Sequence, residues 1–276
     1  MKIVIAGLGI IGGSYAKAIK KYTEHTVIGI NRSKKPLELA LACGAIDREG
    51  TSEDLNDADM LILGTYPKAA VEFIEKNGEY INKDCIVTDT CGIKSEICGN
   101  MVHLSEKFGF TFVGTHPMAG KEINGFSASD SELFQGASCI IVPCKARRKS
   151  VETVIEFVTS IGFTQTPIVT PKVHDRMIAF TSQLPHALAC AYVLSPVCRN
   201  HKGFSAGSYR DVSRVAKINA ELWTELFLEN KAPLLSELDT LIDNLSRIRN
   251  NIANEDYQSL YRQLQAGRAV KEELNE

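Results

Sequence analysis

Short apolar runs alternate with helical stretches over the first 168 residues. The runs are rich in Ile and Val and bounded by Gly, Asp, Asn or Pro, which predicts buried strands. They lie at 2–6, 26–30, 60–64, 85–88, 110–113 and 138–142. Residues 14–21, between the first two runs, predict a helix. This alternation predicts an α/β domain over residues 1–168, with a doubly wound parallel sheet and helices on both faces.

From Thr170 onward the spacing of apolar residues is helical throughout. Thr170 followed by Pro171 predicts the start of a helix that runs through Ala179 and is kinked or ended by Pro185. Residues 218–230, 232–246 and 254–274 predict three more helices, which gives an all-α domain over 169–276. One of them has a wide apolar stripe, formed by Leu234, Leu235, Leu238, Leu241, Ile242 and Leu245. Such a stripe packs on two neighbours, and part of it is expected to face a second subunit of a homodimer.

Composition and charge limit the possible partners. The net charge of −2, without a long basic or acidic run, argues against nucleic acid. No apolar run reaches the length needed to span a membrane. Six of the eight cysteines lie in or beside apolar stretches and none forms a CxxC pair, so buried free thiols in the cytoplasm are expected, and no metal site. These six are Cys43, Cys85, Cys139, Cys144, Cys190 and Cys198.

The chain opens with the glycine pattern of a dinucleotide site. Gly7-Leu8-Gly9-Ile10-Ile11-Gly12 follows an apolar run and opens a helix, the context that gives the GxGxxG pattern its meaning. In this Rossmann-type arrangement the helix N-terminus faces the phosphates with its free N–H groups. Thr65, just after the third apolar run, joins this predicted cofactor site.

The choice between NAD and NADP depends on the end of the second predicted strand. NAD enzymes usually have an acidic residue there for the ribose 2′-hydroxyl. This chain instead has Asn31, Arg32 and Ser33. A neutral amide does not repel a 2′-phosphate and Arg32 can bind one, which favours NADP slightly. Asn31 can still bond to a ribose hydroxyl, so NAD stays open.

One histidine has the position expected of a proton acceptor. His116 lies in Gly114-Thr115-His116-Pro117-Met118-Ala119-Gly120, which predicts a short turn directly after the strand at 110–113. Ligands of open α/β sheets bind at this end of the strands. A neutral imidazole can accept the proton that leaves an alcohol during its oxidation, so the sequence predicts a dehydrogenase.

Several motifs in order resemble those of prephenate dehydrogenases, a family that includes arogenate dehydrogenases. The matching segments are residues 7–13, Asp89-Thr90-Cys91-Gly92-Ile93-Lys94, residues 114–120, His174-Asp175-Arg176, Ser182-Gln183-Leu184-Pro185-His186, Tyr209-Arg210-Asp211-Val212-Ser213-Arg214, and Trp223. The resemblance implies oxidative decarboxylation of prephenate to 4-hydroxyphenylpyruvate with hydride transfer to NAD(P), in tyrosine biosynthesis. Arogenate, which would give tyrosine directly, is the alternative substrate.

The same resemblance assigns roles to individual residues. His116 would accept a hydrogen bond from the ring hydroxyl, and Arg214 would bind a substrate carboxylate. Arg210, four residues earlier, would share that pocket if the stretch is helical. His186 would approach the substrate side chain, and Lys94 would orient backbone or contact ligand.

Two positions depart from the family pattern. Many members carry a serine where this chain has Gly92, and the serine reaches the ring hydroxyl and the histidine; a hydroxyl of Thr90 or Thr115, or a water, would have to replace it. Gln183 stands where a histidine is common, so pH behaviour tied to that position is expected to be absent.

Two other functions fit parts of the sequence. A β-hydroxyacid dehydrogenase or imine reductase shares the architecture but usually uses a lysine or aspartate of the helical domain. A catalytically silent nicotinamide-binding regulator would explain Gly92 but not the presence of both His116 and Arg214. Because the chain ends at Glu276 after a helix, we expect no added regulatory domain and tyrosine inhibition that competes with substrate.

Overall fold

The computed structural model describes residues 1–121 and 123–274, which form two compact units. The first unit comprises residues 1–178 and 217–229, and the second comprises residues 179–216 and 230–276. The predicted boundary at 168/169 stays a prediction. Residues 122 and 275–276, which the predicted domains include, lie outside the described residues.

The first unit is built on a seven-stranded sheet in the order β3-β2-β1-β4-β5-β6-β7. Its strands are β1 (Lys2–Ala6), β2 (Thr26–Ile30), β3 (Arg48–Glu49), β4 (Met60–Leu63), β5 (Ile86–Asp89), β6 (Thr111–Pro117) and β7 (Cys139–Val142). All neighbours pair in parallel except β6 and β7, which are antiparallel. The predicted α/β fold is confirmed, with a difference at each edge of the sheet: β7 is antiparallel, and β3 was not predicted.

Both edge differences have a physical reason. The connection from β6 to β7 contains only one short 3-10 turn, η3 (Phe126–Ala128), among its described residues. A parallel return usually runs through a crossover helix, which the described part of this connection lacks, and β7 pairs antiparallel. Strand β3 was not predicted because its two residues are polar and exposed, and they leave no apolar pattern.

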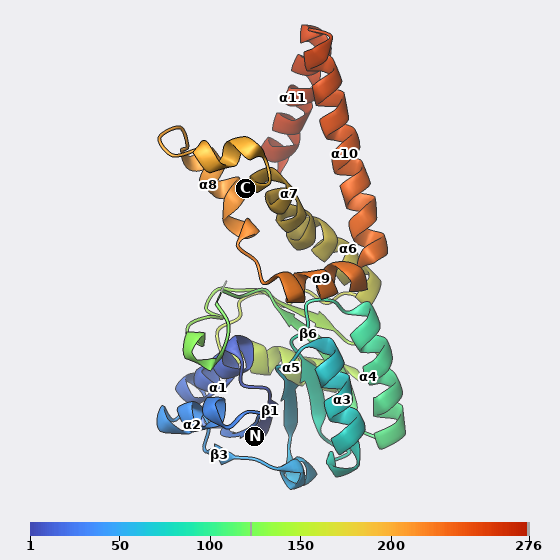
Figure 1. Cartoon of the computed structure of the whole chain (residues 1–276). Helices are drawn as coiled ribbons and strands as arrows, with labels where there is room; N and C mark the ends of the chain where they lie inside the picture. The colour runs from blue at the N-terminus through green and yellow to red at the C-terminus, as the bar shows by residue number, and fades with distance from the viewer. Residues whose placement is uncertain (122, 275–276) are drawn as a thin grey trace. The chain divides into compact units, whose positions relative to one another are not determined.

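Helices cover both faces of the sheet, as the buried strands require (Figure 1). One buried cluster joins the sheet to α1 (Ile10–Tyr22), α2 (Lys34–Ala42) and α5 (Arg148–Ser160). The other joins it to α3 (Pro67–Asn77) and α4 (Ser95–Phe108). Successive residues of β1 alternate between the clusters, with Ile3 and Ile5 in one and Val4 and Ala6 in the other. The 3-10 turns η1 (Ser52–Asp57) and η2 (Gly78–Tyr80) complete this part of the chain.

The helix predicted after Thr170 is divided into three segments. They are α6 (Pro171–Ile178), the π-helical turn η4 (Ala179–Gln183) and α7 (Leu184–Val193). Pro185 lies in the first turn of α7, where its missing N–H costs no helical hydrogen bond. The predicted break in the helix therefore lies before Pro185, in the π-helical turn η4, and the proline lies in the first turn of the next α-helix.

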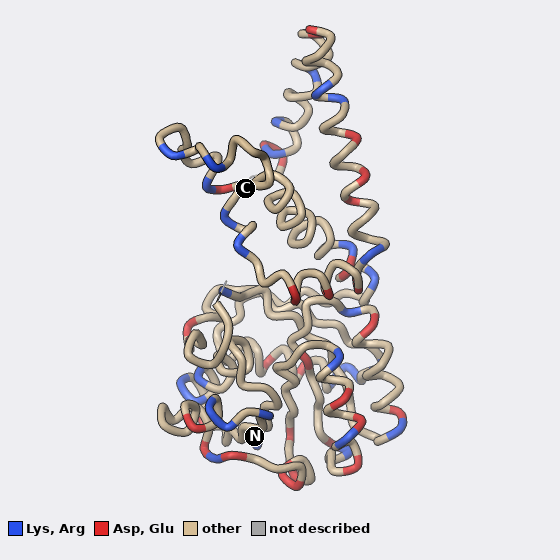
Figure 2. The backbone as a smooth tube through the Cα atoms, viewed as in Figure 1, with Lys and Arg blue, Asp and Glu red and all other residues tan. Residues whose placement is uncertain are grey.

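The remaining segments are helical. They are η5 (Pro196–Asn200), α8 (Gly207–Ser213), η6 (Arg214–Ala216), α9 (Ala220–Glu229), α10 (Lys231–Ala253) and α11 (Tyr257–Glu273). Of these, α9, α10 and α11 correspond to the three further helices that were predicted. Helix α9 belongs to the first unit and the others to the second. The described part of the chain contains no helix both long and apolar enough to cross a membrane. Basic and acidic positions are interspersed along the chain (Figure 2).

The burial of apolar and cysteine side chains follows the prediction only in part. Of the apolar stripe on α10 only Leu234 is buried, whereas Leu235, Ile242 and Leu245 are exposed. All eight cysteines are unpaired thiols. Of the six expected to be buried, Cys85 and Cys139 are buried, Cys144, Cys190 and Cys198 are half-buried, and Cys43 is exposed because it lies just after the last turn of α2.

Candidate active site

The glycine loop between β1 and α1 is shaped by close backbone packing. Gly7 has φ +99°, and a Cβ there would overlap the Thr65 side chain and the Gly64 carbonyl. A Cβ at Gly12 would overlap the carbonyl oxygen of Gly7. At Gly9, by contrast, no described atom lies within 4 Å of the Cβ position. The loop therefore leaves space at Gly9, where a pyrophosphate could approach the backbone.

Polar groups around this loop fit a dinucleotide. Helix α1 begins at Ile10 without a side-chain cap, so its first N–H groups point toward the open space beside Gly9. The buried hydroxyl oxygen of Thr65 has no hydrogen-bond partner among the described residues. A buried polar atom of this kind normally finds a partner, and a bound ligand supplies one.

The end of β2 braces the loop and presents positive charge. The Asn31 Oδ1 accepts a hydrogen bond from the Leu8 N–H at 2.9 Å, and its Nδ2 donates to the Ser33 carbonyl at 2.9 Å. Asn31 thus holds the glycine loop in place. Arg32 and Ser33 are exposed beside it.

His116 lies in β6 and not in a turn. The strand continues to Pro117 because its last four residues pair with β7, with His116 opposite Ile140. The turn predicted from the flanking Gly and Pro residues was therefore wrong, although the predicted position at the end of a sheet strand is correct. The strand holds the imidazole on a rigid element, and the His116 residue is half-buried.

A chain of hydrogen bonds runs from His116 to a buried carboxylate on α6. The Nδ1 of His116 lies 2.9 Å from the Nε2 of His174, and the Nδ1 of His174 lies 2.7 Å from an oxygen of Asp175. Asp175 also accepts hydrogen bonds from the backbone N–H groups of Lys94 and Ser95, each at 2.8 Å. The residue-by-residue assignment missed His174 and Asp175, although both stand in a motif that the resemblance marked.

The environment keeps both histidines neutral and Asp175 ionised. Burial, with the charge of Lys94, lowers the pKa of His116 well below its ordinary value. Burial also lowers the pKa of His174, although Asp175 opposes it. Burial alone would raise the pKa of Asp175, but hydrogen bonds from His174, Ser95 and Lys94 outweigh it and the pKa is lowered.

Lys94 is fully buried and paired within the first unit. Its Nζ donates to Asp89 at 2.5 Å and to the Cys91 carbonyl at 2.7 Å. Asp89 in turn accepts from the backbone N–H of Thr115 at 3.1 Å, next to His116. Burial lowers the pKa of Lys94, but the charge of Asp89 outweighs it and the pKa is raised. This ion pair fixes the turn after β5 against β6.

Gly92 lies beside the Nε2 atom of the His116 ring. A Cβ at this position would be 4.0 Å from His116 Nε2 and 3.5 Å from Leu226 of α9, which is ordinary contact. A serine would therefore fit. The two hydroxyls considered as replacements are used elsewhere, since Thr90 donates to the Leu63 carbonyl and Thr115 to the Asp89 carbonyl.

The other predicted substrate residues belong to the second unit. Arg210 lies in α8 and Arg214 follows it with helical backbone, so the spacing of four places both guanidinium groups on one side; both are exposed. The Nδ1–H of His186 donates to the Ser182 carbonyl at 2.8 Å. Gln183 is buried and accepts a hydrogen bond from Asn230 at 2.7 Å. The contact of each with a substrate stays a prediction.

Comparison with known proteins agrees with this arrangement. The chain is 29% identical over 287 residues to a prephenate dehydrogenase of Bacillus subtilis, covering 99% of this chain and 76% of the relative. It is 26% identical to a solved prephenate dehydrogenase of Aquifex aeolicus in complex with hydroxyphenyl propionate and NAD+, with a TM-score of 0.88 over 99% of this chain and 98% of the other. A Synechocystis arogenate dehydrogenase gives 25% identity and a TM-score of 0.85, over 99% and 100% of the two chains.

Two family models cover most of the sequence. The model of the prephenate dehydrogenase nucleotide-binding domain matches residues 15–165, and that of the prephenate dehydrogenase dimerization domain matches residues 170–266. The chain belongs to the prephenate dehydrogenase family and is an oxidoreductase that uses a nicotinamide dinucleotide.

Proposed function

We propose that this protein catalyses the oxidative decarboxylation of prephenate to 4-hydroxyphenylpyruvate. The observation that carries the proposal is the Nε2 of the half-buried His116, 4.0 Å from the Cβ position of Gly92, in the unit that also holds the dinucleotide loop. A neutral imidazole at this place can accept the proton of a substrate hydroxyl.

The chain's own groups have a limited chemical task. Prephenate carries a ring hydroxyl and a ring carboxylate, and loss of the carboxylate as carbon dioxide makes the ring aromatic. The bound nicotinamide supplies the hydride acceptor. Because aromatisation favours the reaction, the protein mainly orients the substrate and removes one proton. His116 takes the hydroxyl proton, and Arg214 with Arg210 holds the carboxylates through charge-assisted hydrogen bonds.

Among the two dinucleotides we favour NADP. The exposed Arg32 and Ser33 follow β2 with no acidic residue between Asn31 and Lys35 to repel a 2′-phosphate. Asn31 uses its amide to brace the loop, which supports a role in shaping the site more than in reading the ribose. NAD is the alternative.

Tyrosine is proposed to compete with substrate. Tyrosine shares the six-membered ring and the three-carbon acid side chain of the substrates, so residues that bind one can bind the other. Added tyrosine should raise the apparent KM and leave kcat unchanged. A decrease of kcat at constant KM would point to a separate site.

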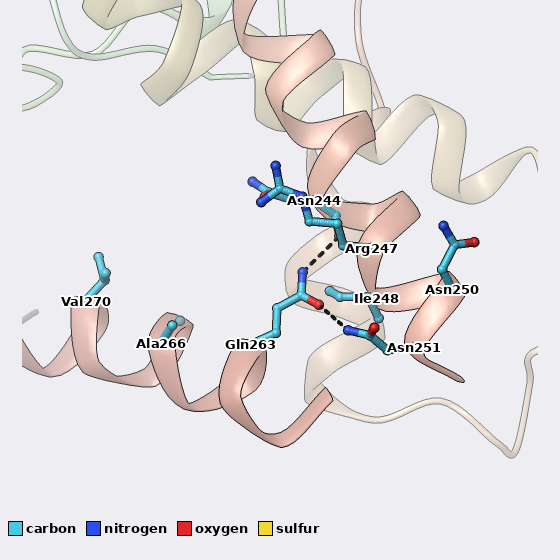
Figure 3. Close-up of a pocket in the computed structure, with 9 residues that line it drawn as sticks. Asn244, Arg247, Ile248, Asn250, Asn251, Gln263, Ala266 and Val270 are labelled. Atoms are coloured by element: carbon cyan, nitrogen blue, oxygen red, sulfur yellow. Dashed lines mark hydrogen bonds between the residues drawn. The ribbon is translucent and has the colours of Figure 1, made fainter. Parts of the chain in front are cut away.

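A second copy of the chain is the proposed partner of the second unit. Exposed apolar side chains on α10 and α11 include Leu235 and Ile242, which are 47% and 55% exposed, and Leu264 and Val270. The two helices border a hollow of about 800 Å³, where Gln263 bridges Asn244 and Asn251 (Figure 3). Apolar patches of this extent mark interaction surfaces, which supports a homodimer.

The eight unpaired thiols fit a reducing compartment, and we propose the cytoplasm.

Initial rates in a four-way cross test the function: prephenate or arogenate, each with NAD or NADP. We expect turnover with prephenate and the higher rate with NADP. A faster rate with arogenate would assign the protein to the alternative substrate. If all four rates stay at background while the dinucleotide binds, the proposed function is wrong for the native chain, and Gly92→Ser would show whether the missing hydroxyl is the cause.

A further inference from the structure

The two hydrogen bonds between His116, His174 and Asp175 determine where each ring carries its proton. Asp175 is ionised and can only accept, so the Nδ1 of His174, 2.7 Å away, must be the donor. A neutral His174 then has a lone pair on Nε2. That lone pair faces the Nδ1 of His116 at 2.9 Å, so His116 must donate from Nδ1.

This sequence of donors leaves the lone pair of His116 on Nε2. The Nε2 is the ring atom that lies toward Gly92, 4.0 Å from its Cβ position. The opposite tautomer would place a proton there and a lone pair against the lone pair of His174. The buried carboxylate of Asp175 thus selects the tautomer of His116 through the ring of His174, which lies between them.

We propose that His174 and Asp175 are positioning residues that hold His116 in the tautomer able to take the substrate proton, an inference that rests on the proposed function of His116. The pair also stabilises the imidazolium that forms when His116 is protonated. The Nδ1–H of the charged His116 ring then donates to His174, which is itself hydrogen-bonded to the negative carboxylate of Asp175. A buried carboxylate behind a histidine base has the same effect in serine hydrolases.

The anchoring of Asp175 makes this selection rigid. Its two oxygens accept backbone N–H groups of Lys94 and Ser95 at the start of α4, each at 2.8 Å. His174 is buried and its ring centroid lies 5.1 Å from that of His116. The carboxylate therefore cannot rotate away from His174 without leaving two backbone donors unpaired, which is costly in the interior.

The nitrogen resonances of labelled histidines test the proposal directly. Protein carrying ¹⁵N-histidine is recorded by long-range ¹H–¹⁵N correlation, with His103→Gln, an exposed histidine of α4, as a matched control for assignment. We expect His116 to carry its proton on Nδ1 in the native protein. In His174→Phe, which removes the acceptor, the form protonated on Nε2 should become populated.

Kinetics supply the second readout. We expect His174→Phe to lower kcat by about 100-fold, the usual contribution of a general base, with KM nearly unchanged. His174→Gln places an amide oxygen near the position of Nε2 and should restore both the Nδ1–H tautomer and about tenfold of the lost kcat. A native His116 protonated on Nε2, or an unchanged tautomer and kcat in His174→Phe, would overturn the inference.

The two proposals can fail separately. If the native protein turns over neither substrate, the proposed function fails, while the resonances still report the tautomer. If the native protein is active and the tautomer does not depend on residue 174, only the present inference fails. Should His174→Phe not fold, judged by its thermal melt, the native spectrum and His174→Gln still decide.

Discussion

In the first unit both faces of the sheet are covered, and even Tyr15 and Phe134 are fully buried, whereas in the second unit Ile242 and Leu245 of α10 stand exposed. The polar groups differ in the same way. In the first unit Lys94 and Asp89 are buried and bonded to each other, and His116 is bonded through His174 to the buried Asp175. The polar groups of the first unit are therefore positioned by contacts within that unit. The exposed apolar side chains of the second unit would be covered only by another molecule, which is proposed above to be a second copy of the chain.

The largest effect expected from this difference concerns association. Ile242→Asp should weaken a symmetric dimer by about 3–6 kcal/mol, since each apolar side chain contributes about 1.5–3 kcal/mol and the interface contains it twice. The dissociation constant should rise by about 10²–10⁴-fold in sedimentation velocity. Thr240→Asp adds the same charge on the opposite side of α10 and should leave association intact. Equal sedimentation of both variants as native dimers would refute this surface.

Breaking the buried ion pair should be the largest effect within the first unit. Lys94→Met leaves Asp89 charged and unpaired in the interior, which should lower the free energy of unfolding by about 3–5 kcal/mol. Chemical denaturation measures the loss. Lys145→Met removes an exposed partner of Glu106 and serves as control, with little change expected. Similar losses in the two variants would contradict the contrast between buried and exposed charge.

Substitution of Arg214 should affect binding and leave the first unit unchanged. Arg214→Ala removes a charge-assisted hydrogen bond to a substrate carboxylate, worth about 2–3 kcal/mol, so kcat/KM should fall by about 100-fold. Dinucleotide affinity, measured by fluorescence titration, should stay constant. Arg199→Ala, an exposed arginine of the same unit, is the control. A native kcat/KM in Arg214→Ala would remove this residue from the substrate site.

A smaller effect on stability is expected from the partly buried carboxylate of Glu229 in the first unit. Burial, with Glu225, Glu96 and Asp175 nearby, raises the pKa of Glu229 to about 7. A raised carboxyl pKa means that the folded protein loses stability as pH rises from the unfolded value near 4.5 to about 7. Glu229→Gln should therefore stabilise the protein at pH 8 by about 1–2 kcal/mol, reduced for its partial exposure, and by nothing at pH 4. A gain that is equal at both pH values would contradict the titration of Glu229.

The smallest effect is expected at the exposed end of β2. Arg32→Ala should raise the dissociation constant of NADP by about tenfold through loss of one phosphate contact, and that of NAD hardly at all. Lys35→Ala on the first turn of α2 is a nearby control. Equal loss for both dinucleotides would mean that Arg32 does not read the 2′-phosphate.

Much of the fold followed from the sequence, because the first unit obeys local rules. Strands β1 and β2 have the predicted bounds since buried parallel strands are continuous apolar runs, and Pro171 begins a helix because proline suits a first turn. Strand β3 left no pattern. The strand extension that contains His116 depends on pairing with β7, which local sequence does not encode.

The sequence by itself determined the residue types of the proposed site: the glycine loop, His116, Arg214 and Gly92 can be recognised because their chemistry is carried by single residues at fixed spacing. Only the tertiary structure decided that His174 and Asp175 stand behind His116, that Lys94 is committed to Asp89, and that the hydroxyls of Thr90 and Thr115 point elsewhere. Hydrogen-bond partners and burial depend on elements as far apart as 81 residues, and no local pattern contains that information.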